Sequence, residues 1–311
     1  MAKIVIALGG NALGNNPKEQ QELVKIPAQK IVNLVKMGHQ VIVGHGNGPQ
    51  VGMIFNAFSD AKKVNDKTPL VPFAEAGAMS QGYIGYHLLN AINNELIKQG
   101  LDEQQAVYFL SQTIVDGNDP AFKKPTKPVG PFYQTKAAAL KVYGEDASVI
   151  EDAGRGYRLV VASPQPVDFF GLNAIKNSIN QGHINVVAGG GGIPTIFKDG
   201  IYQGVNGVID KDLALAKLAK LIDADCLIIL TAVDRVFVNY NQPNQSALLQ
   251  ADVKTLNKYI KENQFAPGSM LPKVEAAISF VKDTKNKYAI IADLNKVELA
   301  LEGKSGTKIV A

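Results

Sequence analysis

Two lysines and an aspartate stand where they could bind a phosphate group. In "VNGVIDKDLALAKLAKLID", Asp210 is expected to cap a helix whose first turn holds Lys211 and Asp212. In "PGSMLPKVEAAISF", Pro272 is expected at the first helical position, directly before Lys273. A lysine at the positive end of a helix costs about 0.3–1 kcal/mol relative to an acid. Two such lysines make sense if both face a bound anion and Asp212 pairs with either; the alternative is two solvated lysines without a role.

Three of the expected strands end in clusters of small residues. Glycine lets backbone N–H groups converge on an anion, and the carboxyl ends of parallel strands meet at one edge of a sheet. Three clusters at one edge favour a multiply charged ligand, with phosphate as the first candidate, although three ordinary tight turns are the alternative. The clusters are Gly9-Gly10-Asn11, Gly44-His45-Gly46-Asn47-Gly48 and Gly189-Gly190-Gly191-Gly192.

A further cation lies in a proline-rich segment. Lys127 stands in "KKPTKPVGPF", where Pro125, Pro128 and Pro131 each fix the backbone angle φ. A lysine on such a stiffened loop could reach into a cleft, or it could be an ordinary surface residue. Positioned cations, convergent amides and the lack of a candidate nucleophile indicate phosphoryl transfer, in which catalysis is mostly positioning and charge neutralisation.

Other catalytic and binding motifs fail on spacing. The segment "GHGNGPQVG" reads G-x-G-x-x-x-G from Gly46, whereas a dinucleotide fingerprint requires G-x-G-x-x-G. "GKS" at 303–305 is not a P-loop, because Glu298 takes the place of its first glycine. The sequence holds no HExxH, paired CxxC or G-x-S-x-G. His45 has no partner at ligand spacing, so we expect it to be structural and expect no metal site.

Composition excludes several classes of protein. The chain has 311 residues, 46% hydrophobic and 19% charged, which is typical of a globular protein. Its net charge of +4 comes without the basic run that nucleic-acid binding would require. Cys226 is the only cysteine, so no internal disulfide can form. Because no apolar run reaches signal-peptide or membrane-spanning length, we expect a cytoplasmic protein that binds neither membranes nor nucleic acid.

Short apolar runs alternate with segments of helical periodicity, which is typical of a parallel sheet covered by helices on both faces. Residues 116–166 are rich in proline and glycine and predict a lid or an inserted subdomain. We expect strands at 3–8, 40–44, 105–110, 184–189, 226–231 and 288–292, and helices at 19–37, 73–99, 168–181, 211–222, 252–262 and 272–283.

Several segments together resemble one known family. "ALGGNAL", "GHGNGPQVG", "KPTKPVGPF", "EDAGRG", "GGGGIP", "VIDKDLA" and "FAPGSMLPK" closely resemble motifs of the bacterial carbamate kinases, which have the amino-acid kinase fold. The resemblance runs from residue 3 to about residue 290. It implies an α/β protein, an open and mostly parallel αβα sandwich of the amino-acid kinase type with a protruding lid subdomain, working as a homodimer. Residues 1–190 would bind carbamate or carbamoyl phosphate, with the lid inserted at about 118–166, and residues 191–311 would bind the nucleotide.

The resemblance also implies roles for single residues. Lys211 and Lys273 would neutralise the transferred phosphoryl group, Asp212 would organise them, and Lys127 would reach the carbamoyl phosphate from the lid. Substrate-binding amides would come from Gly9, Gly10, Asn11, Gly46, Asn47 and Gly48. Nucleotide contacts would come from Gly190, Gly191, Gly192, Val233, Asp234, Val236, Tyr240, Gly268, Ser269 and Met270. The segment "TAVDRVFVNY" departs from the family pattern at Ala232 and Arg235.

The implied reaction is reversible phosphoryl transfer between carbamoyl phosphate with MgADP and carbamate with MgATP, running toward ATP in arginine catabolism. Mg²⁺ would arrive on the phosphates of ADP or ATP, since the sequence offers no carboxylate cage for it. Two alternatives stay open. One is a phosphotransferase of the same fold with another acceptor, such as an amino-acid carboxylate or a nucleoside monophosphate; the other is a nucleotide-binding regulator without turnover.

Overall fold

The structure is a computed structural model that describes residues 1–9, 13–152, 154–267, 269–282 and 284–311. Three residues assigned to the site from sequence, Gly10, Asn11 and Gly268, lie outside the described residues. None of the described helices is both long and apolar enough to cross a lipid bilayer.

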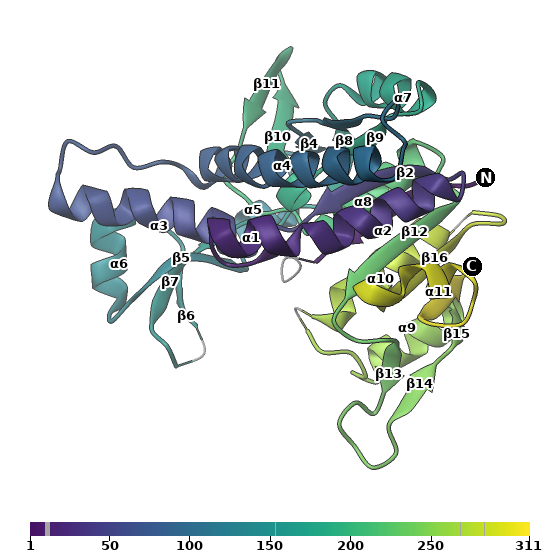
Figure 1. Cartoon of the computed structure of the whole chain (residues 1–311). Coiled ribbons are helices and arrows are strands. Elements are labelled where there is room, and N and C mark those ends of the chain that lie inside the picture. Colours follow the sequence, from purple (N-terminus) through teal and green to yellow (C-terminus); the bar gives the residue numbers. More distant parts are fainter. Residues whose placement is uncertain (10–12, 153, 268, 283) are drawn as a thin grey trace.

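A mostly parallel, eight-stranded sheet runs through the molecule (Figure 1). All six strands expected from the sequence are in it, which confirms the α/β fold. Within the described residues, β16 and β17 are its one antiparallel pair. The strands in spatial order are β15 (Gln250–Asp252), β17 (Thr307–Val310), β16 (Tyr288–Asp293), β12 (Cys226–Thr231), β1 (Lys3–Leu8), β2 (Gln40–His45), β9 (Ile184–Val186) and β3 (Ala106–Tyr108).

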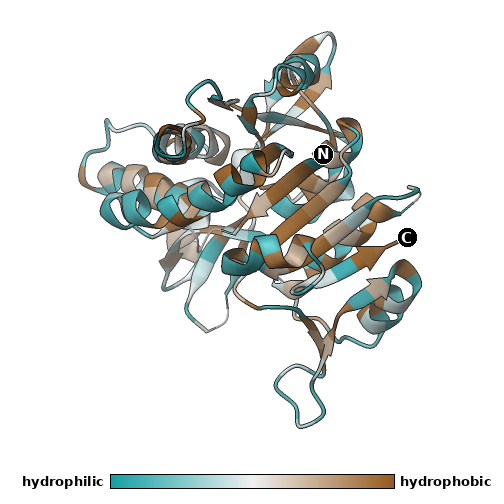
Figure 2. Ribbon diagram, turned by 45° about the vertical axis from the view of Figure 1, so that its right-hand side comes forward, coloured by the Kyte–Doolittle hydropathy of each residue, from teal (hydrophilic) through white to brown (hydrophobic). Residues whose placement is uncertain are grey.

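Helices cover both faces of this sheet because successive strand residues point to opposite sides. Val5 and Ala7 of β1 pack in the core formed with α7 (Leu172–Asn180), α8 (Lys211–Leu221), α9 (Val253–Lys261) and α10 (Met270–Val281). Ile4 and Ile6 pack in the core formed with α2 (Lys25–Lys36), α4 (Phe73–Lys98) and α11 (Val297–Leu301). In Figure 2 the central strands are largely hydrophobic, whereas the covering helices carry many hydrophilic residues.

The sheet has two halves that meet where β1 pairs with β12. The strands of residues 1–190 form one half and those of residues 191–311 the other. A substrate-binding and a nucleotide-binding lobe divided at residue 190 stays a prediction. A second sheet joins β11 (Ile201–Gly204), β10 (Ile193–Lys198), β4 (Gln112–Val115) and β8 (Pro166–Phe169), and a small hairpin joins β13 (Val236–Val238) and β14 (Ser246–Leu248).

The proline- and glycine-rich segment forms a small subdomain that projects from the main sheet, at the lower left of Figure 1. Its antiparallel strands are β5 (Lys127–Tyr133), β7 (Tyr157–Val161) and β6 (Val149–Glu151), preceded by α5 (Pro120–Lys123) and covered by α6 (Lys136–Tyr143). Phe55 of α3 (Gly48–Val64) packs with Val129 and Tyr143 of this subdomain. We call residues 118–166 the lid.

Four local expectations differ from the structure. The glycine segment after β2 leads directly into the 17-residue α3, which the sequence did not predict. The helix expected at 19–37 is divided at Val24 into α1 (Pro17–Leu23) and α2. The helix expected from residue 168 begins at Leu172, because β8 occupies 166–169. Helix α10 begins at Met270, so Pro272 is its third residue; proline is tolerated there because its missing N–H would have no intrahelical partner.

Candidate active site

The N-terminus of α8 is capped as the sequence predicts. Asp210 Oδ1 accepts hydrogen bonds from the backbone N–H groups of Asp212, at 2.9 Å, and Leu213, at 3.4 Å. The cap satisfies amides that would otherwise lack a partner and fixes where the helix begins. Lys211 and Asp212 are therefore held in the first turn of α8, next to the carboxyl edge of the sheet.

Asp212 pairs with both predicted lysines at once. Its Oδ1 accepts from the ammonium of Lys211, and its Oδ2 accepts from Lys273 Nζ at 2.8 Å. The carboxylate side chain is only 3% exposed, and the lysines are 15% and 17% exposed. Burial alone would raise the pKa of Asp212, but the two ammonium groups outweigh it and hold that pKa below its usual value. Two cations around one anion leave one net positive charge for a ligand.

The lid contributes a third lysine beside this pair. Lys127 Nζ lies 3.8 Å from Oδ2 of Asp210, the residue that caps α8. Lys127 is 38% exposed, so solvent screens the pair and it adds little stability. The contact nevertheless places a lid cation next to the first turn of α8. The three lysines singled out from sequence therefore gather in one region, although they come from β5, α8 and α10.

Lys211 and Lys273 line a cavity of about 770 Å³, a volume typical of small-molecule sites. Gly9, at the end of β1, lies in the same wall. Most of the remaining wall is apolar, and Asp293, Asn295 and Gln264 add a few polar groups. The apolar part consists of Leu8, Leu230, Ala232, Val233, Phe237, Tyr240, Phe265, Ala266, Met270 and Leu294. One wall suits phosphates and the other a flat apolar base.

The predicted nucleotide contacts are only partly in this wall. Val233, Tyr240, Ser269 and Met270 line the cavity. Val236 is fully buried and its N–H donates to Thr307 Oγ1 at 2.9 Å, so it supports the wall from behind. Asp234 is absent from the lining; it accepts a hydrogen bond from Ser305 and pairs with Lys296. The cavity lining thus gives no support to the nucleotide contacts predicted for Val236 and Asp234.

Sequence reasoning missed other lining residues. Gln264 lies in a loop outside the quoted motifs. Phe237 of β13 lies within "TAVDRVFVNY" and Phe265 opens "FAPGSMLPK", but neither was singled out. Asp293, Leu294 and Asn295 directly follow β16, so the end of that expected strand was an available signal.

The glycine turn after β2 lies beside the end of β1, because β1 and β2 pair in parallel with Leu8 opposite His45. Gly46 N–H donates to Leu8 O at 3.1 Å, which ties the turn to the end of β1. Helix α3 starts at Gly48 without a side-chain cap, so its first amides are available to an anion. The side-chain amide of Asn47 donates to Ser80 Oγ at 2.8 Å. Asn47 and Gly48 thus offer backbone N–H groups at the start of α3, and the substrate contacts predicted for Gly46, Asn47 and Gly48 stay untested.

The glycines at 190–192 are absent from the lining of the larger cavity: Gly190 packs against Asn47 of this turn, Gly191 against Ile209 and Gly192 against Thr113. Gly190 and Gly192 line a small hollow of about 20 Å³ together with Asn47. A side chain on Gly190 would overlap the Asn47 amide, and one on Gly191 would overlap the Ile209 carbonyl. Close packing therefore explains these glycines, and the nucleotide contacts predicted for Gly190, Gly191 and Gly192 stay untested.

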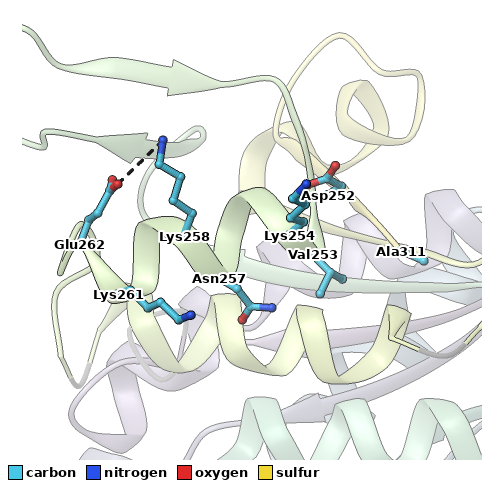
Figure 3. A pocket seen from close by; sticks show the side chains of 8 residues that line it. All are labelled: Asp252, Val253, Lys254, Asn257, Lys258, Lys261, Glu262 and Ala311. Carbon is cyan, nitrogen blue, oxygen red and sulfur yellow. Dashed lines mark ion pairs between the residues drawn. The ribbon is translucent and has the colours of Figure 1, made fainter.

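A second hollow, of about 820 Å³, lies along α9 and beside the C-terminus (Figure 3). Its wall carries lysines and acids, among them Lys258 and Glu262, whose charged atoms are 3.9 Å apart. It shares no residue with the cavity at Lys211, and such exposed pairs are typical of a solvated helix face. Among the described residues, no three acidic, histidine or cysteine side chains gather as a metal site would require.

Comparisons with known proteins agree with this geometry. The family model "Amino acid kinase family" matches residues 2–293. The chain is 59% identical, over all of both chains, to the carbamate kinase-like protein of Mycoplasma pneumoniae. It is 50% identical, over 99% of both chains, to carbamate kinase of Clostridium perfringens. Among solved structures, carbamate kinase from Giardia lamblia bound to AMP-PNP has a TM-score of 0.93 and 39% identity, covering 99% of this chain and 98% of that one.

Proposed function

The chain belongs to the amino acid kinase family, and from that premise we propose that it is a carbamate kinase. It transfers a phosphoryl group between carbamoyl phosphate with ADP and carbamate with ATP. The observation that carries the proposal is the placement of Lys211 and Lys273, joined by Asp212, in the wall of a nucleotide-sized cavity. Full-length identity of 50% to a carbamate kinase supports the same choice of substrates.

The nucleotide occupies the 770 Å³ cavity. Its base and ribose lie against the apolar wall that includes Val233, Tyr240 and Met270, and its phosphates face Lys211 and Lys273. The related Giardia lamblia enzyme has been solved with AMP-PNP, which supports an adenine nucleotide. Mg²⁺ arrives with the nucleotide phosphates as part of the substrate, where it neutralises charge between neighbouring phosphoryl groups.

Carbamoyl phosphate binds at the turn Gly46–Asn47–Gly48. The uncapped start of α3 offers amides to its oxygens, and Lys127 reaches it from the lid. The single net positive charge of the Lys211–Asp212–Lys273 group attracts the dianionic phosphate from the other side. When carbamoyl phosphate binds, Lys127 would leave Asp210 and pair with the substrate. The lid would thereby respond to binding.

The reaction needs no covalent intermediate on the protein. An oxygen of the terminal phosphate of ADP forms a bond to the phosphorus of carbamoyl phosphate. The bond from that phosphorus to the carbamate oxygen breaks, and its electron pair leaves on carbamate. Lys211 and Lys273 stabilise the charge on the transferring group, while Asp212 keeps both ammonium groups in place instead of acting as a base.

We further propose a homodimer, as the family resemblance implies. An exposed aromatic group on the second sheet is a candidate interface: the Phe170 and Phe197 rings lie 4.9 Å and 4.6 Å from the Tyr202 ring, and all three are about half exposed. Analytical ultracentrifugation of the purified chain tests this. The direction toward ATP in arginine catabolism and the cytoplasmic location stay predictions.

An assay of the purified chain separates the proposal from its alternatives. Carbamoyl phosphate and MgADP should yield ATP. ATP consumption only with another acceptor, such as an amino-acid carboxylate or a nucleoside monophosphate, would establish a different phosphotransferase of the same fold. Tight ATP binding without turnover on any acceptor would establish a regulator. The retention of Lys127, Lys211, Asp212 and Lys273 supports catalysis.

A further inference from the structure

A buried histidine and a partly buried tyrosine stand directly behind the glycine turn. His45 is the last residue of β2 and is fully buried. Tyr108 is the last residue of β3, and β9 lies between the two strands. The Tyr108 hydroxyl lies 2.8 Å from His45 Nε2, and His45 Nδ1 lies 2.8 Å from the carbonyl oxygen of Gly46. Both ring nitrogens therefore have a partner inside the protein.

These partners define the tautomer of the imidazole. The Gly46 carbonyl can only accept, so Nδ1 carries the proton and donates it; Nε2 then accepts from the Tyr108 hydroxyl. Burial lowers the pKa of His45 to about 4, and the nearby positive charge of Lys211 acts in the same direction. The ring is consequently neutral near pH 7 and fixed at both ends.

The surrounding chain leaves room for Tyr108. A side-chain carbon on Gly85 of α4 would lie 2.7 Å from atoms of the Tyr108 ring. One on Gly189 would overlap the Tyr108 hydroxyl and lie 2.7 Å from His45 Nε2. Two positions from separate segments thus have to be glycine for this ring to reach the histidine. A tyrosine that only fills space would not require glycine at both positions. The contact between Tyr108 and His45 is therefore specific.

The hydrogen bond to Gly46 has a consequence for the substrate turn. The Gly46 carbonyl and the Asn47 N–H belong to one planar peptide group and point in opposite directions. Because the imidazole holds the carbonyl, it also fixes the direction of the N–H, away from the ring and at the start of α3. No acceptor within the described residues takes that N–H.

We propose that His45 and Tyr108 are positioning residues that hold the Gly46–Asn47 peptide so that the Asn47 N–H donates to an oxygen of bound carbamoyl phosphate. The inference rests on the proposed function, since it takes the Gly46–Gly48 turn as the site of carbamoyl phosphate. Neither side chain touches the substrate. Their effect is to preorganise an amide donor, which spares the turn from reorganising when the substrate binds.

Matched variants separate this role from simple packing. His45→Asn keeps an amide N–H near the position of Nδ1, whereas His45→Gln moves it toward the position of Nε2. We expect His45→Gln to raise the KM for carbamoyl phosphate about tenfold, the cost of one well-placed hydrogen bond, and His45→Asn to restore most of that loss. Tyr108→Phe removes one hydroxyl and should raise the KM for carbamoyl phosphate roughly a few-fold. The KM for MgADP should stay within about twofold of wild type, because the nucleotide cavity has no lining residue in this turn.

A spectroscopic measurement distinguishes failure of this inference from failure of the proposed function. The ¹⁵N shifts of the His45 ring should show the Nδ1–H tautomer in wild type and a mixture of tautomers in Tyr108→Phe. If wild type makes ATP but all three variants keep its KM for carbamoyl phosphate, the positioning role is overturned and the function stands. If wild type makes no ATP, the function fails; an Nε2–H tautomer in that protein would also overturn the hydrogen-bond assignment. Thermal unfolding checks that each variant is folded, and Tyr108→Phe carries the test if the His45 variants are not.

Discussion

Lys273 Nζ donates to Oδ2 of Asp212 at 2.8 Å, although the two residues are 61 positions apart and lie on different helices. Helices α8 and α10 pack side by side in one core, which brings the first turn of each to the same cavity. Lys211 holds the other oxygen of the carboxylate. The result is a rigid pair of ammonium groups at a fixed separation, which is what a phosphoryl group in transfer requires.

Asp212→Asn should destabilise the nucleotide-free protein. The change leaves two largely buried ammonium groups without their counter-charge, so the free energy of unfolding should fall by about 3 kcal/mol. Urea unfolding measures this, and MgADP should restore part of the loss because its phosphates supply negative charge. Asp252→Asn is the control, since asparagine also caps a helix and Asp252 is exposed. Equal effects of the two substitutions would rule out a special role for Asp212.

Lys127→Ala should affect one substrate only. The lysine lies on the lid beside the cap of α8 and outside the nucleotide cavity. Its removal should raise the KM for carbamoyl phosphate at least about tenfold, as for a lost charged hydrogen bond, and leave the KM for MgADP unchanged. Initial-rate kinetics measure both values. Lys124→Ala, at an exposed lid position, should match wild type. A rise in the MgADP value alone would place Lys127 at the nucleotide.

Tyr240→Ala should have the opposite selectivity. Its ring lines the nucleotide cavity and lies 6.0 Å from the ring of Phe237. Loss of the aromatic face should raise the KM for MgADP about tenfold, since base stacking on an aromatic side chain contributes about 1–3 kcal/mol. The KM for carbamoyl phosphate should not change. Tyr86→Ala, at an exposed tyrosine of α4, is the control, and the assignment fails if both variants behave alike.

The stability of the protein should depend on pH through His45. The folded pKa is about 4 and the ordinary value is 6.5, so between these values the unfolded chain binds a proton that the folded chain excludes. The stabilising contribution of neutral His45 is complete above pH 6.5 and is lost as pH falls toward 4. Between pH 7 and pH 5, wild type should lose about 2 kcal/mol more unfolding free energy than His45→Asn. The unfolding free energy of both proteins is measured with urea at pH 7 and at pH 5. An equal loss in wild type and in His45→Asn would mean that His45 titrates normally.

The sheet could be predicted because its strands are apolar on both faces and end in small residues. Ile4 and Val5 illustrate this, since each is fully buried but in a different core. Helix α3 could not be predicted in the same way. Its first residues, from Gly48 to Gly52, include two glycines and a proline, which favour a turn, and only packing of residues such as Phe55 against the lid reveals the helix.

Helix-start signals identified Lys211 and Lys273. They did not show that the carboxylate of Asp212 holds both lysines. That depends on how α8 and α10 pack, which local sequence does not encode. The glycines at 190–192 show the converse problem. A glycine after a strand serves an anion or a close contact equally well, and Gly192 faces Thr113, whose hydroxyl donates to Gly191 O at 2.8 Å. Gln264 carried no motif, so only the folded chain places it at the cavity.

The central claim is that the ammonium groups of Lys211 and Lys273 stabilise the transferring phosphoryl group. The most direct test compares initial rates of ATP formation from carbamoyl phosphate and MgADP in wild type, Lys211→Ala and Lys273→Ala. Lys217→Ala, on α8 but outside the cavity lining, is the control. Both site variants should be slower by at least about 100-fold, or about 2.7 kcal/mol in the barrier, while the control keeps the wild-type rate. A near-normal rate in a folded Lys211→Ala or Lys273→Ala would contradict the account.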